Sequence, residues 1–270
     1  MVMGLFVPSL AYASVSEQFF QRGIHISDDW GIFRTRATGA DGFLGITSTG
    51  LDPIIARESL GNNTDVAWEL GDEFVRKYPD RLQRAEEIFY YVRNRVRYTS
   101  DLDQFGIGEF AQNADEVVES IAANGIAQGD CEDSAVLAAV MYKAAGYRSA
   151  LVLMPGHVAA IVYLPEYRKA PRKLTLDGEE GWVWAEATGA TNPFGWIPES
   201  LVSGGMIARE VSSDRLATQR DGTGAVRIED GATAKGGEAA SGTGLLVLLG
   251  VVGFLWVAAG RRRDSTSRRW

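Results

Sequence analysis

The stretch that decides the fold is "GDCEDSAVLAAVMYKAAGY", residues 129–147. Asp130 is a favourable N-cap residue, and the residues from Ala135 to Met141 are apolar nearly all round. The pattern therefore predicts a buried helix that begins at Cys131. This helix places the only cysteine of the chain at its N-terminus, with carboxylates on both sides of it.

The residues after this helix alternate in a way that is typical of β-strands. "SALVLM" (149–154) and "HVAAIVYL" (157–164) are separated by a Pro-Gly turn, and "WVWAEATG" (182–189) follows the polar segment 168–181, which we expect to be a loop. Apolar residues at helical spacing precede the helix between residues 66 and 96. A buried helix followed by an antiparallel meander indicates the α+β class.

Composition excludes several classes of protein. The chain has 270 residues, 46% of them hydrophobic, which is enough for one good-sized core. Its net charge of -8 argues against nucleic acid as a partner, because phosphate binding needs a basic surface. One cysteine excludes an intramolecular disulfide and a multi-cysteine metal site. The two histidines, His25 and His157, exclude a histidine-rich site.

The C-terminal sequence is typical of a membrane anchor. Residues 243–260 are uncharged and strongly apolar, and a helix of this length spans roughly 27 Å, close to the thickness of the hydrocarbon core. The tail, residues 261–270, contains five arginines and one acid, so the positive-inside rule places it in the cytoplasm. We therefore expect a single-pass protein of the cell membrane, with the main domain outside the cytoplasm.

The remaining boundaries follow from composition. Residues 1–13 are apolar and end in an A-x-A pattern, as in a signal peptide or an uncleaved hydrophobic segment. Residues 14–64 form an N-terminal extension without a strong period, and residues 65–203 hold the folded domain. Residues 204–242 are rich in Gly, Ala, Thr and charge, which predicts a flexible stalk.

Three residues have the chemistry of a thiol-dependent site. Cys131 begins the buried helix, His157 begins a strand, and Glu186 lies in the third strand. A cysteine nucleophile needs a base and a group that orients the base. The helix N-terminus and an imidazolium would lower the thiol pKa, whereas neighbouring carboxylates would raise it. From the residues alone, the more usual interpretation is a small buried cysteine, a histidine at a surface or turn position and a solvated strand carboxylate.

Residues 129–147, 150–164 and 182–189 resemble the transglutaminase-like superfamily, and more narrowly its membrane-associated members in archaea and bacteria. "AEEIFYYVRNRVRYTSD" upstream, ending at Tyr98 and Asp101, and "FGWIPESL" downstream are also similar to that family. The resemblance implies a papain-like α+β core in which Cys131 is the nucleophile, His157 the base and Glu186 the orienting acid. Many relatives have Asp in place of Glu186.

The function that the resemblance implies is a membrane-anchored thiol enzyme, acting on amide bonds of peptides or proteins by hydrolysis or acyl transfer. No cofactor is required for this chemistry. The backbone N–H of Cys131 is one candidate oxyanion donor, and Gln128 and Trp184 are candidates for the second. The alternative is an inactive module that binds peptides or scaffolds a complex of the cell envelope. Animal transglutaminases have Gln before the cysteine where this chain has Asp130, which argues against a simple transfer of their crosslinking activity.

The acids around Cys131 allow three interpretations. Asp130 and Asp133 can cap the helix. The arrangement "DCE" also resembles that of bacterial transglutaminase-like cysteine proteases, which use the two flanking acids to bind Ca²⁺, and by that resemblance Asp130 and Glu132 are calcium ligands. Direct contact with substrate is the third interpretation.

Overall fold

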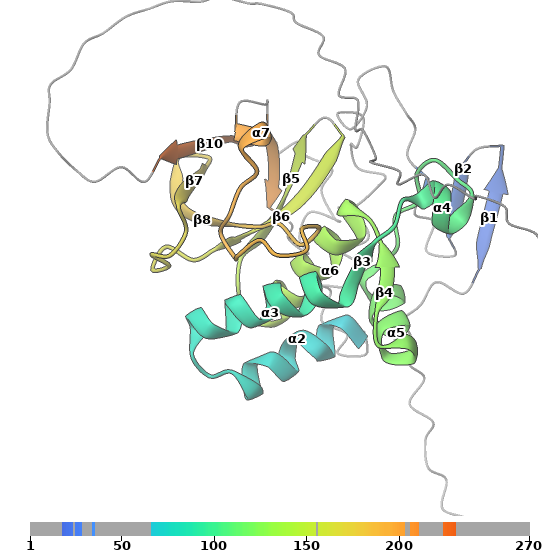
Figure 1. Cartoon of the computed structure of the whole chain (residues 1–270), viewed down its shortest axis with the longest axis horizontal. Helices are drawn as coiled ribbons and strands as arrows, with labels where there is room; N and C mark the ends of the chain where they lie inside the picture. Colours follow the sequence, from blue (N-terminus) through green and yellow to red (C-terminus); the bar gives the residue numbers. More distant parts are fainter. Residues whose placement is uncertain are drawn as a thin grey trace, which may run out of the picture. The chain divides into compact units, whose positions relative to one another are not determined.

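Helices precede most of the strands in this α+β chain, as Figure 1 shows. The computed structural model describes residues 18–23, 25–28, 34–35, 66–154, 156–202, 206–210 and 224–230. The helices are α2 (Val66–Lys77), α3 (Arg81–Arg95), α4 (Asp101–Phe105), α5 (Ala114–Asn124), α6 (Cys131–Ala144) and α7 (Glu199–Val202). The strands are β1 (Phe19–Arg22), β2 (His25–Asp28), β3 (Val96–Tyr98), β4 (Ala127–Gly129), β5 (Ser149–Met154), β6 (His157–Tyr163), β7 (Arg172–Leu176), β8 (Glu179–Ala185), β9 (Ile207–Glu210) and β10 (Gly224–Asp230).

Helix α6 is the centre of the core. Its residues from Cys131 to Tyr142 are all buried, as the continuous apolar run predicted. It packs against α2, α3 and α5 and also against β5 and β6. Helix α2 approaches it closely at Gly71, where an added Cβ would lie 2.6 Å from Ala144 Cβ. The predicted buried helix on an antiparallel sheet is therefore confirmed.

The large sheet is antiparallel and has the strand order β10-β7-β8-β6-β5-β9, closed by the pairing of β10 with β9. In the β5–β6 hairpin, Met154 pairs with His157. In the β6–β8 pair, Ala160 lies opposite Ala185. His157 therefore begins β6 close to the point where the chain leaves β8 at Glu186.

Strand β7 lies where the sequence predicted a polar loop, so that prediction is wrong for residues 172–176. Leu174 and Leu176 are buried, but the basic residues before them hide the alternation in the sequence. Asp177 and Gly178 connect β7 to β8 with positive φ angles of 52° and 83°. An Asp-Gly turn of this kind is a strong hairpin signal, and it could have corrected the prediction.

Strands β9 and β10 correct the prediction of a flexible stalk over residues 204–242. Residues 207–210 pair with β5, and residues 224–230 pair with β7. The high content of Gly, Ala, Thr and charge in the surrounding sequence conceals these two short strands. Both strands are stabilised by pairing with neighbouring strands, which their local composition does not predict.

The predicted leader (1–13), membrane helix (243–260) and basic tail (261–270) lie outside the described residues. Within the described part, none of the helices combines the length and the apolar character needed to cross a membrane.

Part of the N-terminal extension supports the segment that precedes α5. Strands β1 and β2 form an antiparallel hairpin. The buried Arg34 guanidinium contacts Asp28 Oδ2 at 2.7 Å and Glu116 Oε2 at 3.0 Å, and it donates to the Ala111 carbonyl at 2.9 Å. This ion-pair network fixes the chain next to Gln112, which in turn contacts the start of α6.

Candidate functional site

His157 and Glu186 form a direct pair. His157 Nε2 lies 2.7 Å from Glu186 Oε2, and the glutamate is only 3% exposed. Thr188 donates its backbone N–H to Glu186 Oε1 at 3.2 Å, and its hydroxyl donates to the same oxygen. Burial alone would raise the pKa of Glu186, but the hydrogen bond and charge of His157 and the two Thr188 donors lower it below the usual value.

The loop after Glu186 is held to the helical layer. Asn192 Nδ2 donates to the Glu186 carbonyl at 2.6 Å, and Arg93 of α3 donates to the Asn192 carbonyl at 2.5 Å. A Cβ at Gly189 would lie 2.0 Å from Asn192 Oδ1, so only glycine lets the asparagine approach the loop this closely. The sequence analysis missed Asn192, because its amide contacts backbone that is close only in the folded loop.

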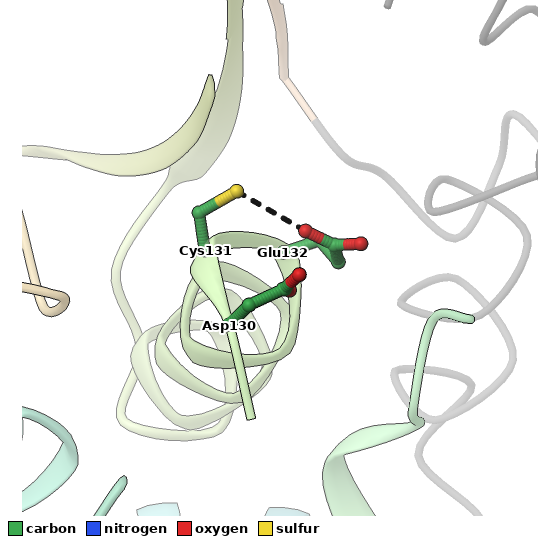
Figure 2. A group of neighbouring side chains, drawn as sticks. All are labelled: Asp130, Cys131 and Glu132. Atoms are coloured by element: carbon green, nitrogen blue, oxygen red, sulfur yellow. Dashed lines mark hydrogen bonds between the residues drawn. The ribbon is translucent and has the colours of Figure 1, made fainter. Parts of the chain in front are cut away.

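Cys131 lies at the first position of α6 and is 6% exposed. Its thiol donates to Glu132 Oε2 at 3.1 Å, as Figure 2 shows. The backbone N–H of Val158 donates to the sulfur, so the residue next to His157 contacts the thiol. Within the described residues, Cys131 forms no hydrogen bond with the His157 ring. The structure thus brings Cys131 to the start of β6 and His157 to Glu186.

Burial and the flanking carboxylates dominate the electrostatic environment of Cys131. Burial raises the thiol pKa well above its usual value, and the charges of Glu132 and Asp130 raise it further, while the Val158 N–H partly opposes them. The sequence placed two opposite effects on this pKa, the helix N-terminus with an imidazolium against the neighbouring carboxylates. In the structure the effects that raise the pKa prevail.

Asp130 is the N-cap residue of α6 and forms a capping box with Asp133, the third residue of the helix. The Asp133 carboxylate accepts from the backbone N–H of Asp130 at 3.2 Å, and from the N–H and side-chain amide of Gln112 at 2.8 and 2.6 Å. Burial and the charge of Glu132 raise its pKa to about 8, although the Gln112 hydrogen bonds act in the opposite direction. The predicted capping role of Asp133 is confirmed, and Gln112 is a second partner that the sequence did not indicate.

Asp130 and Glu132, whose side chains are drawn in Figure 2, belong to a larger group of carboxylates. Burial raises the pKa of Asp130 to about 10, and a hydrogen bond and charge from Glu132 contribute next. Three ligand sets have donor atoms within 4.8 Å of one another: Asp130 with Cys131 and Glu132, Asp101 with Asp130 and Asp133, and Asp101 with Glu109 and Glu132. Glu109 was missed because it lies in an irregular loop after α4.

The donor chemistry of this group fits a calcium ion. Ca²⁺ takes about six to eight oxygen ligands, and carboxylates supply them readily. Asp130 and Glu132 would be the central ligands, with Asp101 and Glu109 next to them. A divalent cation would also offset the charges of Glu132 and Asp133, which add to the effect of burial in raising the pKa of Asp130.

Trp184, one of the two residues predicted to supply a second oxyanion donor, has a different contact. Its indole N–H donates to Glu186 Oε2 at 3.4 Å, and its side chain is buried. In this arrangement the indole N–H of Trp184 is engaged by the candidate orienting acid. Gln128, the other candidate, lies in β4 with an exposed side chain, and its carbonyl accepts from Gln112.

Together these elements define the class, an α+β domain in which a buried, cysteine-bearing helix packs on an antiparallel sheet beside a His–Glu pair. The family model of the transglutaminase-like superfamily matches residues 69–199, which include Cys131, His157 and Glu186. The chain therefore contains a domain of the transglutaminase-like superfamily.

Among solved structures, the chain is similar to a candidate protease from Parabacteroides distasonis, with 16% sequence identity and a TM-score of 0.35. The match covers 60% of this chain and 30% of the other, so this chain spans less than a third of that protein's length. No curated protein matches the chain at a significant level.

Proposed function

We propose that the domain is a cysteine-type hydrolase or acyl transferase acting on amide bonds of peptides or proteins. Cys131 is the nucleophile, His157 the base and Glu186 the group that orients it. The observation that carries the proposal is the 2.7 Å contact between His157 and Glu186 next to Val158, whose N–H contacts the thiol. A purely structural cysteine would not require this buried pair beside it.

In the proposed mechanism each ring nitrogen of His157 has its own role. Because Nε2 contacts Glu186, Nδ1 is the nitrogen left to take the proton of Cys131. The sulfur then attacks the amide carbonyl, and the backbone N–H of Cys131 donates to the oxyanion. The imidazolium protonates the leaving amine as the C–N bond breaks, and water or a second amine releases the acyl group from the sulfur.

Calcium at the carboxylate group is part of the proposal. Glu132 accepts a hydrogen bond from the thiol, and together with burial it raises the thiol pKa, so the carboxylates oppose thiolate formation. Ca²⁺ held by Asp130 and Glu132, with Asp101 and Glu109 nearby, would supply positive charge beside the sulfur. We therefore expect the thiol to be more reactive with calcium than without it.

A second candidate function is a non-catalytic module that binds peptides or scaffolds a complex. The 6% exposure of Cys131 and its raised pKa favour this alternative. A non-catalytic module would give no function to the hydrogen-bond donors around Glu186. For that reason we place this alternative second.

The decisive experiment uses the full chain, in which every thiol label reports on Cys131 because no other cysteine exists. Iodoacetamide labelling and the turnover of glutamine and peptide amide probes are measured with Ca²⁺ and with EGTA. We expect turnover that requires Cys131 and His157, and labelling that is faster with Ca²⁺. His25→Ala is the matched control for His157→Ala, since these are the two histidines of the chain.

Contrary results separate the two parts of the proposal. An absence of turnover, with labelling unchanged by His157→Ala, would favour the non-catalytic module. Turnover that is unchanged by EGTA would contradict the proposed role of calcium and would leave the proposed triad unaffected.

The location at the membrane also remains a proposal, supported by the sequence alone. Residues 243–260 would span the bilayer once, with the transglutaminase-like domain outside the cytoplasm and residues 261–270 inside. Resistance to carbonate extraction, together with protease access to the domain in intact cells, is the expected result. Release by carbonate would contradict it.

A further inference from the structure

The two carboxylate oxygens of Glu186 have different hydrogen-bond partners, and these include residues outside the three proposed catalytic ones. Oε2 contacts His157 Nε2 at 2.7 Å and accepts the more distant Trp184 indole N–H at 3.4 Å. Oε1 accepts two hydrogen bonds, both from Thr188. Each oxygen thus has its own set of donors, and within the described residues both donors to Oε1 belong to Thr188.

The separate partners of the two oxygens bear on the orientation of the Glu186 carboxylate. A glutamate has one more rotatable bond than an aspartate, so its carboxylate can turn away from the histidine unless something holds it. Thr188 is β-branched, which restricts rotation about its χ1 bond, and its backbone is in the loop that Asn192 fixes. Its hydroxyl is therefore a firmly placed donor that selects one orientation of the carboxylate.

We propose that Thr188 is a positioning residue, whose hydroxyl holds Glu186 Oε1 so that Oε2 faces His157 Nε2. The catalytic consequence rests on the proposed function, whereas the effect on the His157–Glu186 pair does not. Trp184 cannot substitute for Thr188, because its N–H contacts the oxygen that faces His157. Asn192 holds the main chain of Glu186 and leaves the carboxylate free to rotate.

The first test compares variants that differ in one hydroxyl. Thr188→Val keeps the shape and the backbone N–H but removes the hydroxyl, and Thr188→Ser keeps the hydroxyl. We expect Thr188→Val to lower kcat by about tenfold to a hundredfold, with KM changed by less than about twofold, because the base is misplaced while substrate binding is retained. Thr188→Ser should recover most of the activity, and Thr188→Ala replaces the valine variant if that protein does not fold.

Thr175→Val is the matched control. Thr175 is a buried threonine of β7 in the same sheet, and its hydroxyl has no hydrogen-bond partner in the described part of the chain. This variant should retain activity. In a Glu186→Gln background, Thr188→Val should have less than about a twofold further effect, because the two side chains act as a unit. Independent, multiplying losses would overturn the proposal.

The second test does not need activity. The chain has two histidines, so a ¹⁵N-histidine spectrum shows two imidazoles, and His157→Ala assigns them. At a pH where the ring is neutral, we expect His157 in the tautomer protonated at Nε2, donating to Glu186. Thr188→Val should convert this signal to a mixture of tautomers, and Thr188→Ser should restore it.

The two tests separate the two hypotheses. If the wild type is inactive but Thr188→Val alters the His157 signal, the proposed function fails and the positioning role stands. If Thr188→Val leaves the His157 signal unchanged, the positioning role is overturned, whether or not activity is present. A variant that loses stability and raises KM, with an unchanged His157 signal, would show a merely structural role and would also overturn it.

Discussion

Glu186 and Asp130 are carboxylates of the same candidate site, yet the protein shifts their pKa values in opposite directions. Glu186 is the more deeply buried of the two, and its pKa is lowered, because His157 and Thr188 donate to it. Asp130 is partly buried, and its pKa is raised to about 10, because burial is reinforced by the hydrogen bond and charge of Glu132. Burial acts in the same direction on both, so the neighbouring groups decide the outcome.

The two carboxylates mark two ends of the site, the His157 end with Glu186 and the Cys131 end with Asp130. The neighbouring groups that act on the carboxylate differ between these ends. At the His157 end, the chain itself supplies the donors that the carboxylate needs. At the Cys131 end, carboxyl groups face one another, and Asp130 forms no ion pair within the described residues. Protons or a bound cation would reduce the repulsion among these groups, which is why calcium and pH should affect this end and leave the His157 end nearly unchanged.

The largest effect is expected from removing the charge of Glu186. Glu186→Gln keeps the size of the side chain but replaces the carboxylate that contacts His157 with a neutral amide. We therefore expect kcat to fall by about 10³-fold. Steady-state kinetics on an amide probe measures this loss. Glu199→Gln is the matched control, because Glu199 is an exposed glutamate whose partner is Arg172. A loss below about threefold for Glu186→Gln would mean that the pair does not support catalysis.

The second prediction concerns stability against pH without a divalent cation. Asp130 and Asp133 have pKa values of about 10 and about 8 in the folded state, against an ordinary value of 3.8. The folded state therefore binds more protons than the unfolded state between these values. Stability should fall as pH rises from 5 to 8, by at most about 1.4 kcal/mol per pH unit for each excess proton.

Chemical denaturation in EGTA at several pH values measures this trend. The lowered pKa of Glu186 has the opposite sign, since its contribution is lost only when the pH falls through its folded value. An increase in stability from pH 5 to pH 8 would show that the carboxylates of the Cys131 end are already neutralised by other parts of the chain.

The third prediction is that calcium stabilises the protein through the Cys131 end. At a Ca²⁺ concentration of 100 times Kd, the free energy of unfolding should increase by about 2.7 kcal/mol. Thermal unfolding at pH 7.5, with and without Ca²⁺, measures the shift. Glu132→Gln should abolish most of it, whereas Glu119→Gln, at an exposed position of α5, should preserve it. An equal shift in both variants would place the bound calcium elsewhere.

The sequence predicted the two ends of the site unequally well. Helix α6 and the strands β5, β6 and β8 could be recognised, because their burial is written in continuous or alternating apolar residues. The proximity of His157 and Glu186 follows from those strands being neighbours. Asp101 and Glu109 also lie near Glu132, but they come from other segments of the chain. Only the folded structure brings their carboxylate oxygens near that residue.

The state of the thiol could not be predicted because opposing effects of similar size act on it. The sequence places Cys131 at a helix N-terminus and also between two acids, and the two features shift the pKa in opposite directions. The depth of burial and the direction of the Glu132 side chain decide between them. Neither quantity is encoded in the local residue pattern.

The smallest effect should come from Gly129→Ala, which tests how tightly the Cys131 end is packed. An added Cβ would lie 2.8 Å from Asp133 Oδ2, and this short side chain cannot withdraw without losing its hydrogen bonds to Gln112. We expect a destabilisation of about 1 to 2 kcal/mol from this overpacking, measured by urea denaturation. Gly108→Ala is the matched control, because a Cβ there meets no atom within 4 Å and its φ angle is not in the positive range. Because Gly129→Ala disturbs the Asp133 cap and leaves the Glu186 loop alone, calcium-dependent stabilisation should weaken while the His157 tautomer stays as in the wild type. A change in that tautomer would mean that the two ends of the site are mechanically coupled and that their different pKa shifts have a common cause.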